Sequence, residues 1–481
     1  KLPQAVDEAG IYTHDASGFE GAMVYTPKGN AGDANTKVIE ALMGQERLMA
    51  RGRLKHSYPH SWRSKAPLIY RNTDQWFVSM GDENADGLRA TALKAISETA
   101  FFPEQGRRRL ESMVSSRPDW LLSRQRAWGV PMPLFVHRQS RELLVDEDVN
   151  QRIVEIFTAE GSDAWFARPA SDFLGSHYNP DDYEQVHDIL DVWFDSGSTH
   201  AFVLEQRDDL AWPADLYLEG SDQHRGWFQS SLLEACGTRG RAPYKQVLTH
   251  GFVLDEQGRK MSKSLGNITA PEEVINSSGA DILRLWVASS DYREDLRIGK
   301  EILKTHTDAY RKLRNTLRYL LGNLGDVRDV PRPDALPVLE RAVLHRLRAL
   351  DVLIREAWGQ YEFARAFHAM YHFCTVDLSA IYFDIRKDAL YCDAGDAPRR
   401  QACLYVLEQL FAHLVRWMAP LLPFTADEAF MSRYGDEVCV HMETLAPIND
   451  QFEDEEANDT FARMLQLRKV MLGALEQARE A

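Results

Sequence analysis

The feature that most constrains the fold is a change of hydrophobic period near residue 300. Between residues 61 and 290, short apolar runs alternate with helical stretches, for example LYLEG before WFQSSLLEAC. Such alternation is typical of βαβ units around a parallel sheet. Beyond residue 300 the helical 3.6-residue period takes over, at 301–322, 337–358, 361–383, 398–418 and 460–480. The sequence therefore predicts an α/β part followed by an all-α bundle.

The 481 residues suffice for two or three domains, because a single core seldom grows beyond about 250–300 residues. Residues 1–60 hold strand-like pieces and one short helical pattern, too little apolar sequence to close a core alone, so we expect them to complete a domain that begins elsewhere. The expected boundaries are 1–60 for the end of that domain, 61–290 for the α/β part, 291–449 for the bundle, and 450–481 for an acidic, solvated linker and the start of a further region.

Composition narrows the classes of protein. Mean hydropathy is −0.39 and every apolar run is interrupted, so no stretch of about 20 residues is predicted to span a membrane. The five cysteines include no CxxC pair, which argues against a zinc knuckle and a disulfide framework and favours a reducing cytoplasm. The N-terminus lacks a secretory pattern and reads as a chain entered midway. With a net charge of −16, a nucleic-acid partner would have to meet a local basic stripe.

Two lysines stand on a predicted loop at the carboxyl end of a strand. A strand candidate at 246–254 and a turn at 255–258 precede the string KMSKSLGN at 260–267, and a helix is predicted to start near Pro271. Ligands of open α/β sheets bind at this end, where ammonium groups can neutralise charge developing on phosphates. Lys260 and Lys263 are therefore candidate catalytic residues, and an ordinary exposed basic turn is the alternative.

A second candidate lies in the string DLYLEGSDQHRGWF at 215–228, where an apolar strand ends in a polar turn that opens a helix. Glycine there allows close backbone approach, and Glu219 or Asp222 can bind an α-ammonium group or ribose hydroxyls. The alternative is a charged helix cap formed by Ser221 or Asp222.

The predicted helix at 302–322 carries two adjacent rows of side chains. An apolar row suited to burial is followed one residue later by a basic row suited to phosphate contacts, with a solvated amphipathic face as the alternative. The apolar row is Leu303, Tyr310, Leu313 and Leu317, and the basic row is Lys304, Arg311, Arg314 and Arg318. Further along, the histidines 368, 372 and 413 fall within apolar faces and are expected in the core.

These strings resemble a known family. KMSKS followed by LGN is similar to the second signature of class I aminoacyl-tRNA synthetases, and LEGSDQHRGWF at 218–228 and DVWFDSG at 191–197 resemble its isoleucyl members. The resemblance implies that Lys263 contacts ATP phosphates and that the basic row contacts tRNA(Ile). It implies adenylate contacts by Glu219, Gly220, Asp222 and Gln223, and an aliphatic pocket shaped by Trp193 and Trp227, for which core packing is the alternative.

The resemblance also implies a fold and a reaction. The fold would be the second half of a Rossmann-type catalytic domain, the remnant of an inserted editing domain, and an α-helical anticodon-binding bundle. The reaction would be ATP-dependent activation of L-isoleucine, assisted by Mg²⁺, and transfer to tRNA(Ile) by a cytoplasmic monomer. No zinc is expected in this segment, because Ser61 and Ser64 stand where some members carry a CxxC pair. The strings at 54–66 and 119–133 also fit the family and are expected to be structural.

The chain departs from the family pattern in three places. It contains no HxGH string, no threonine-rich editing strand and no cysteine-rich C-terminal module. We therefore expect that residues 1–481 alone cannot activate isoleucine. The alternative is a tRNA-binding paralogue without chemistry, although the intact lysine string favours the ligase.

Overall fold

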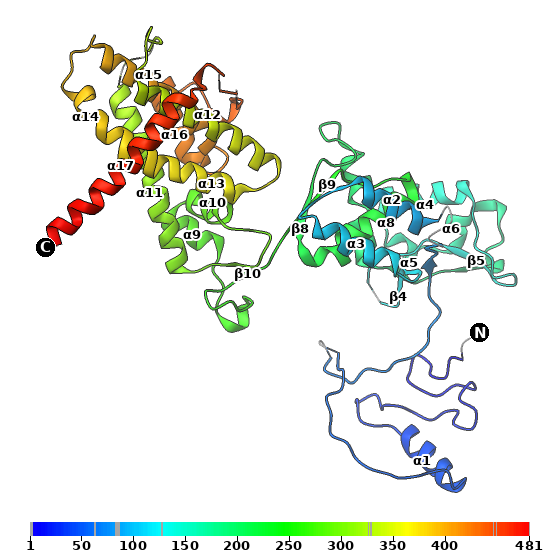
Figure 1. The fold of residues 1–481 in the computed structure, drawn as a ribbon. Helices are drawn as coiled ribbons and strands as arrows, with labels where there is room; N and C mark the ends of the chain where they lie inside the picture. The colour runs from blue at the N-terminus through cyan, green and yellow to red at the C-terminus, as the bar shows by residue number, and fades with distance from the viewer. Residues whose placement is uncertain are drawn as a thin grey trace. The chain divides into compact units, whose positions relative to one another are not determined.

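The computed structural model describes residues 3–61, 64–81, 87–126, 128–325, 327, 330–445, 447–448 and 450–480. The chain divides into two compact units, Lys1–Arg89 with Arg117–Ser196 and Ala90–Ser116 with Gly197–Ala481, and each is described by itself. Figure 1 colours them along the chain. Helices α2 (Leu88–Glu98) and α7 (Val192–Gly197) cross the division.

The first unit begins with irregular chain and one helix, α1 (Ala34–Gly44). The strand-like pieces form isolated bridges only, such as Ile11 with Met23. Helix α1 ends at Gly44, in keeping with the low helix propensity of glycine, and buries only Ala34. This segment thus has little core of its own, and its assignment to the end of an inserted domain stays a prediction.

The rest of the first unit consists of short antiparallel pairs and a small helical module. The strands pair as β1 (Phe77–Val78) with β3 (Trp120–Leu121), β4 (Ser123–Arg124) with β7 (Ile189–Leu190), and β5 (Phe135–His137) with β6 (Tyr183–Gln185). Helices α4 (Glu147–Glu160), α5 (Ala164–Ala167) and α6 (Ala170–Leu174) and the short turns η1 (Gly175–His177) and η2 (Pro180–Asp182) complete the module around Trp165, which is fully buried. The described residues of this unit therefore add no strand to a parallel sheet.

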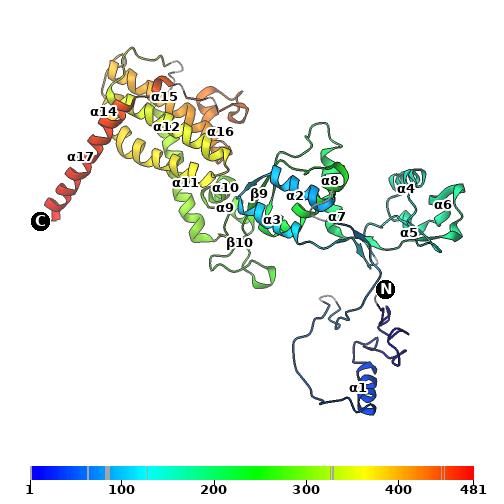
Figure 2. The same cartoon turned by 45° about the vertical axis from the view of Figure 1, so that its right-hand side comes forward.

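The second unit contains the predicted parallel sheet. Its order is β2 (Ala100–Phe102), β9 (Gln246–His250) and β8 (Tyr217–Gly220), and both pairings are parallel. Helices α2, α3 (Gln105–Ser115) and α8 (Trp227–Arg239) gather around it (Figure 2). A π-helical turn, η3 (His200–Leu204), precedes β8. Because the strands are parallel, their carboxyl ends share one edge, where the polar turn after β8 begins.

The strand predicted at 246–254 is broken at Gly251. A Cβ atom there would lie 2.3 Å from the backbone oxygen of Glu294, and the backbone N–H of Gly251 donates to the oxygen of Tyr292 at 2.8 Å, so a distant segment approaches the backbone closely at this point. The second piece, β10 (Val253–Leu254), pairs in parallel with β11 (Leu296–Arg297). Helices α9 (Pro271–Ser278) and α10 (Ala280–Ser289) lie between them in sequence, and α9 starts at the predicted Pro271.

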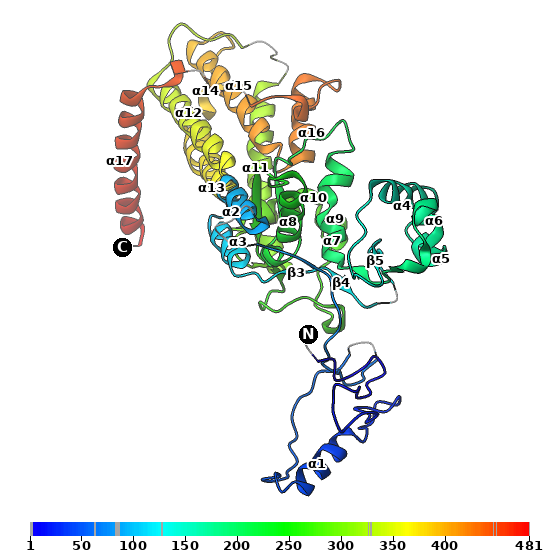
Figure 3. The ribbon, with the colours of Figure 1, turned by 90° about the vertical axis from the view of Figure 1, so that its right-hand side faces the viewer.

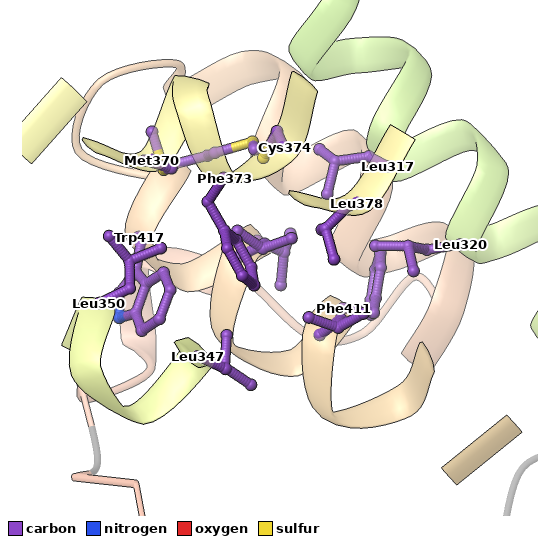
Figure 4. Close-up of a cluster of buried hydrophobic side chains, with 14 of the residues drawn as sticks. Leu317, Leu320, Leu347, Leu350, Met370, Phe373, Cys374, Leu378, Phe411 and Trp417 are labelled. Carbon is purple, nitrogen blue, oxygen red and sulfur yellow. The ribbon is translucent and has the colours of Figure 1, made fainter. Parts of the chain in front are cut away.

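Residues beyond 300 form the predicted helical bundle. Its helices are α11 (Lys300–Leu324), α12 (Val338–Gly359), α13 (Phe363–His372), the π-helical η6 (Phe373–Tyr382), α14 (Phe383–Tyr391), α15 (Pro398–Met418), α16 (Pro423–Tyr434) and α17 (Glu455–Glu480), with short turns η7 (Val440–Met442) and η8 (Asp450–Phe452). Leu317, Leu347, Phe411 and Trp417 meet in its core (Figure 4). The period predicted these helices except α14 and α16, which are only 9 and 12 residues long.

Two interpretations of side chains in the bundle need correction. His368 and His372 are exposed rather than buried, since α13 turns Ala366, Phe367 and Met370 toward the core instead. His413 is half-buried as expected, and burial lowers its pKa to about 4.

The acidic stretch at 450–459 is not a solvated linker where the structure describes it. Arg348 on α12 pairs with Asp450 and Glu453 at 2.9 and 3.0 Å, and Arg341 pairs with Asp454. Phe452 is 5% exposed. The sequence showed the carboxylates but not the arginines that α12 brings opposite them.

Helix α17 has two different halves. Ala457 and Phe461 are buried against α12, whereas the side chains described beyond Leu465 are exposed. Figures 1 and 3 show this second half extending away from the bundle toward the C-terminus. No helix among the described residues is long and apolar enough to cross a membrane.

Candidate active site

The first part of the candidate site is the turn after β8. The strand carries Glu219 and Gly220 to the carboxyl edge of the sheet, η4 (Ser221–Arg225) follows, and α8 begins at Trp227. A Cβ atom at Gly220 would lie 2.7 Å from Oδ1 of Asp222, so only glycine lets that carboxylate fold back over the backbone. Glu219 and Asp222 are both exposed and hence open to a ligand.

Gln223 holds this turn in shape. Its Oε1 accepts the backbone N–H of Trp227 at 3.0 Å, which caps the first turn of α8, and its Nε2 donates to Oδ2 of Asp222 at 3.1 Å. The amide therefore orients a carboxylate predicted to bind substrate. The alternative that Asp222 itself caps the helix is wrong, because Gln223 makes that bond.

His224 is a member of the turn that the sequence did not single out. It is 2% exposed, its Nδ1 bonds the backbone oxygen of Ser221 at 2.8 Å, and burial lowers its pKa. Within the described residues its Nε2 has no hydrogen-bond partner, and it lies 2.9 Å from where a Cβ atom of Gly106 on α3 would stand. The neutral imidazole of His224 thus packs the turn against α3. In the sequence, the position of His224 inside the motif is the only signal of this role.

The two tryptophans predicted to shape the aliphatic pocket differ in their surroundings. Trp227 is half-buried and stacks on Tyr217, with ring centroids 4.1 Å apart and planes 3° apart. Trp193, on α7, is 42% exposed. Just before α7, Asp191 pairs with Arg124 of β4 at 3.0 Å. Stacking fixes Trp227 in one orientation, and exposure leaves Trp193 free to contact a ligand.

The second part of the site is the lysine loop, residues 255–267. Asp255, 5% exposed, organises its base, since it accepts the backbone N–H of Arg259 at 2.8 Å and Nδ2 of Asn267 at 2.8 Å. These bonds, led by that from Asn267, lower the pKa of Asp255 to about 2. Asn267 also accepts the backbone N–H of Ser262 at 3.0 Å. The loop is therefore closed at its base by two polar residues that bracket the lysines.

The lysines themselves stand outside this network. Lys260 and Lys263 are exposed, Lys263 in the short turn η5 (Lys263–Leu265). In the part of the chain that the structure describes, neither forms an ion pair, and no hydrogen bond joins this loop to the turn after β8. Two ammonium groups without protein partners are available to an anion.

The third part is the basic row on α11. Lys304, Arg311, Arg314 and Arg318 are all exposed, while Leu313 and Leu317 of the apolar row are buried and Leu303 and Tyr310 are half-buried. The two predicted rows are thus confirmed as an outer and an inner face. Arg311 pairs with Asp308 at 3.2 Å.

A groove runs beside this row, between α11 and α16. It encloses about 520 Å³, with Leu317, Leu321 and Ala429 among the apolar lining and Arg314 and Arg318 at its side. The groove thus combines an apolar floor with the guanidinium groups of Arg314 and Arg318 and the carboxylate of Glu428.

Metal ligands are not gathered anywhere in the described residues, where no three His, Cys, Asp or Glu side chains lie close enough to hold an ion. In place of a cysteine pair, Ser61 Oγ accepts the backbone N–H of Ser64 at 3.3 Å. Trp62, Arg63 and Ala127, within the strings at 54–66 and 119–133, lie outside the described residues.

Comparison with known proteins matches both parts of the chain. Residues 4–299 match the family model described as tRNA synthetases class I (I, L, M and V), and residues 340–481 match the anticodon-binding domain of tRNA ligase. Among solved structures, a methionyl-tRNA synthetase of Mycobacterium tuberculosis bound by methionyl-adenylate has a TM-score of 0.54 at 19% identity, covering 81% of this chain and 69% of that one. That likeness concerns the fold alone.

Sequence relatives are closer. Isoleucine–tRNA ligase of Mesorhizobium japonicum is 55% identical over 99% of this chain and 49% of its own length. That of Pelagibacter ubique is 50% identical over the whole of this chain and 52% of its own length. The chain therefore spans about half the length of the curated relatives it matches. With a family model over residues 4–299 and relatives at this identity, the chain belongs to the class I tRNA synthetases.

Proposed function

We propose that this chain is the part of an isoleucine–tRNA ligase that supplies the lysine loop, part of the adenylate pocket and the tRNA-binding helices. The observation that carries the proposal is the lysine loop, in which exposed Lys260 and Lys263 rise from a base closed by Asp255 and Asn267. Relatives at 50–55% identity bear the name isoleucine–tRNA ligase.

The first reaction would form isoleucyl-adenylate. A carboxylate oxygen of isoleucine attacks the α-phosphorus of ATP, the bond to the bridging oxygen breaks, and pyrophosphate leaves with the bonding electrons. Negative charge therefore grows on the leaving group. Lys260 and Lys263, which are exposed and form no ion pair among the described residues, would neutralise that charge when the loop lies over the phosphates.

The turn after β8 would hold the amino acid and ribose ends of the adenylate. Glu219 and Asp222 are exposed carboxylates at the sheet edge, and such groups bind an ammonium ion or ribose hydroxyls. Gln223 fixes the orientation of Asp222, so this carboxylate would need little reorganisation on binding. Trp227 would supply apolar surface for the isoleucine side chain, and the same role for Trp193 stays a prediction from the sequence.

Magnesium would accompany ATP rather than occupy a site built by this chain. Among the described residues no cluster of three ligands exists, whereas Mg²⁺ in nucleotide sites is commonly held by the phosphates and only one or two carboxylates. When bound, the ion neutralises phosphate charge. The reaction is expected in the cytoplasm, by a monomer.

The second reaction would transfer the isoleucyl group from AMP to a terminal hydroxyl of tRNA(Ile). The exposed row Lys304, Arg311, Arg314 and Arg318 would contact phosphates of the bound tRNA. The net charge of −16 makes such a local row necessary, because the average surface repels nucleic acid.

The test is isoleucine-dependent exchange of pyrophosphate into ATP by the full-length gene product, with valine as the comparison. We expect exchange with isoleucine, weaker exchange with valine, and a preference of about 10²-fold, which is the discrimination already known for isoleucyl-tRNA synthetases. If no amino acid supports exchange while tRNA(Ile) still binds, the chain is a tRNA-binding paralogue and the ligase proposal is wrong.

A further inference from the structure

The turn that opens the lysine loop is fastened to the start of α11. Oε1 of Glu256 accepts the backbone N–H of Glu301 at 3.1 Å. Helix α11 begins at Lys300, so this N–H is one of the four that a helix leaves without an internal partner. The residue at the N-cap position is Gly299, which has no side chain to bond them. Glu256 therefore caps the helix from a distance of 45 positions along the chain.

Gly299 makes room for this contact. A Cβ atom at Gly299 would stand 1.9 Å from Cγ and 2.1 Å from Oε1 of Glu256. Its φ of 174° is extended backbone that any residue can adopt, so the backbone itself does not require glycine. The steric requirement at this position comes from the Glu256 side chain.

Two further contacts join the same segments. The N–H of Ile298 donates to the oxygen of Leu254 at 3.0 Å, continuing the parallel pair of β10 and β11. The Arg297 guanidinium lies 3.3 Å from where a Cβ atom of Gly258 would stand. The base of the loop is thus held by Asp255 from within the loop. It is also held by contacts with β11 and with the first turn of α11.

We propose that Glu256 is a positioning residue that sets the direction of the lysine loop by tying its first turn to α11. This inference rests on the proposed function. The carboxylate lies at the positive end of the helix dipole, which strengthens the contact. Without it the base of the loop moves more widely, and the two ammonium groups meet the phosphates in the right geometry less often. Such a loss lowers kcat while leaving isoleucine binding intact.

The experiment measures isoleucine-dependent pyrophosphate exchange in the full-length protein for Glu256→Ala and Gly299→Ala. Gly299→Ala is informative because the added methyl group displaces the Glu256 side chain without changing any residue of the loop. Both variants should lower kcat by about 10-fold with KM for isoleucine within about 2-fold. Glu256→Gln keeps an acceptor oxygen and should stay within about 3-fold of the parent.

Two controls separate positioning from general damage. Glu272→Ala removes the same charge from the first turn of α9, on an exposed side chain that forms no ion pair or hydrogen bond with the loop among the described residues, and should leave kcat unchanged. The affinity for tRNA(Ile) should also stay unchanged in every variant, because the basic row lies beyond the first turn of α11.

The double variant Glu256→Ala with Gly299→Ala decides the matter. Both changes break one contact, so the pair should be no slower than either single variant. Effects that multiply, or a Gly299→Ala variant with the parent kcat, would overturn the role of Glu256. A parent protein without isoleucine-dependent exchange would instead overturn the proposed function, which keeps the two failures distinct.

Discussion

The helical bundle and the loops at the sheet edge are built by different forces, although both belong to the second unit. The bundle buries a continuous set of apolar side chains, including Leu347, Phe411 and Trp417 at 0–1% exposure. The loops keep their candidate reactive groups exposed and brace them with buried polar residues, Asp255 and His224. Substitutions in the bundle should therefore change stability, whereas substitutions in the loops should change activity while the protein remains folded.

The largest expected effect is in the apolar core. Phe411→Ala removes a fully buried ring and should cost about 3–5 kcal/mol of the free energy of unfolding, because a cavity remains. Phe252→Ala makes the same change at a ring that is 49% exposed, between β9 and β10, and should cost about 1 kcal/mol or less. Urea unfolding followed by far-ultraviolet circular dichroism measures both. Equal losses of unfolding free energy in the two variants would contradict the claim that the bundle core, and not the loops, determines stability.

Nearly as large an effect is expected at the buried ion pair of the bundle. Arg386 donates to both carboxylate oxygens of Glu340 at 2.6 Å, and the Glu340 side chain is 0% exposed. Arg386→Met leaves that carboxylate buried without its partner and should lower the unfolding free energy by about 3–5 kcal/mol.

The neighbouring Lys387→Met is the control for this prediction. Its pair with Asp384 is exposed, so the change should be within about 1 kcal/mol. A loss of similar size in both variants would show that burial does not set the strength of these pairs.

A substitution at Gly220 should lower the activity of the protein while its stability stays unchanged. Gly220→Ala forces Oδ1 of Asp222 out of its position, 2.7 Å from the new Cβ atom. The carboxylate ends a flexible side chain and can move, so the fold should tolerate the change. Exchange should fall by about 10²-fold, since misplaced binding groups are costly to rate. Gly473→Ala on α17, where nothing lies within 4 Å, should keep the parent rate.

The last prediction is a pH dependence of the bundle, an effect that is smallest near neutral pH and grows as the pH falls. Burial lowers the pKa of His413 from 6.5 to about 4. Between these values the unfolded chain binds the proton and the folded chain does not, so stability falls as the pH falls from about 6.5 to about 4. His413→Gln should reduce the change of the unfolding midpoint with pH across this window. If the dependence of the unfolding midpoint on pH stays the same in this variant, groups other than His413 cause it. The charged groups that face this ring are Asp351, Arg355 and Arg416.

Hydrophobic period predicted the fold class and the long helices of the bundle, but it missed α14 and α16. Leu313 and Leu317 are buried and Arg314 and Arg318 exposed, as their spacing requires, because a helix face depends only on local order. The motifs likewise located Glu219 at the end of a strand, and Asp222 and the two lysines on turns that follow strands. What they contact, including ATP and tRNA, stays a prediction.

Contacts between distant segments were not predictable. The arginines 341 and 348 meet the acidic stretch, and Glu256 meets Glu301, only because the fold brings these elements together. The close approach of Glu294 to Gly251, where the predicted strand is broken, likewise joins segments that are distant in the sequence. His224 gave a weak signal, because a buried and an exposed histidine look alike in a motif.

The most direct test of the central claim compares the activity and stability of Lys263→Ala with those of Lys245→Ala, a lysine just before β9 that pairs with Asp215. In the full-length protein, Lys263→Ala should lower isoleucine-dependent pyrophosphate exchange by about 10²–10³-fold with an unchanged melting temperature. Lys245→Ala should keep the parent exchange rate. Parent-level exchange in Lys263→Ala would contradict the claim that the lysine loop acts on the phosphates of ATP.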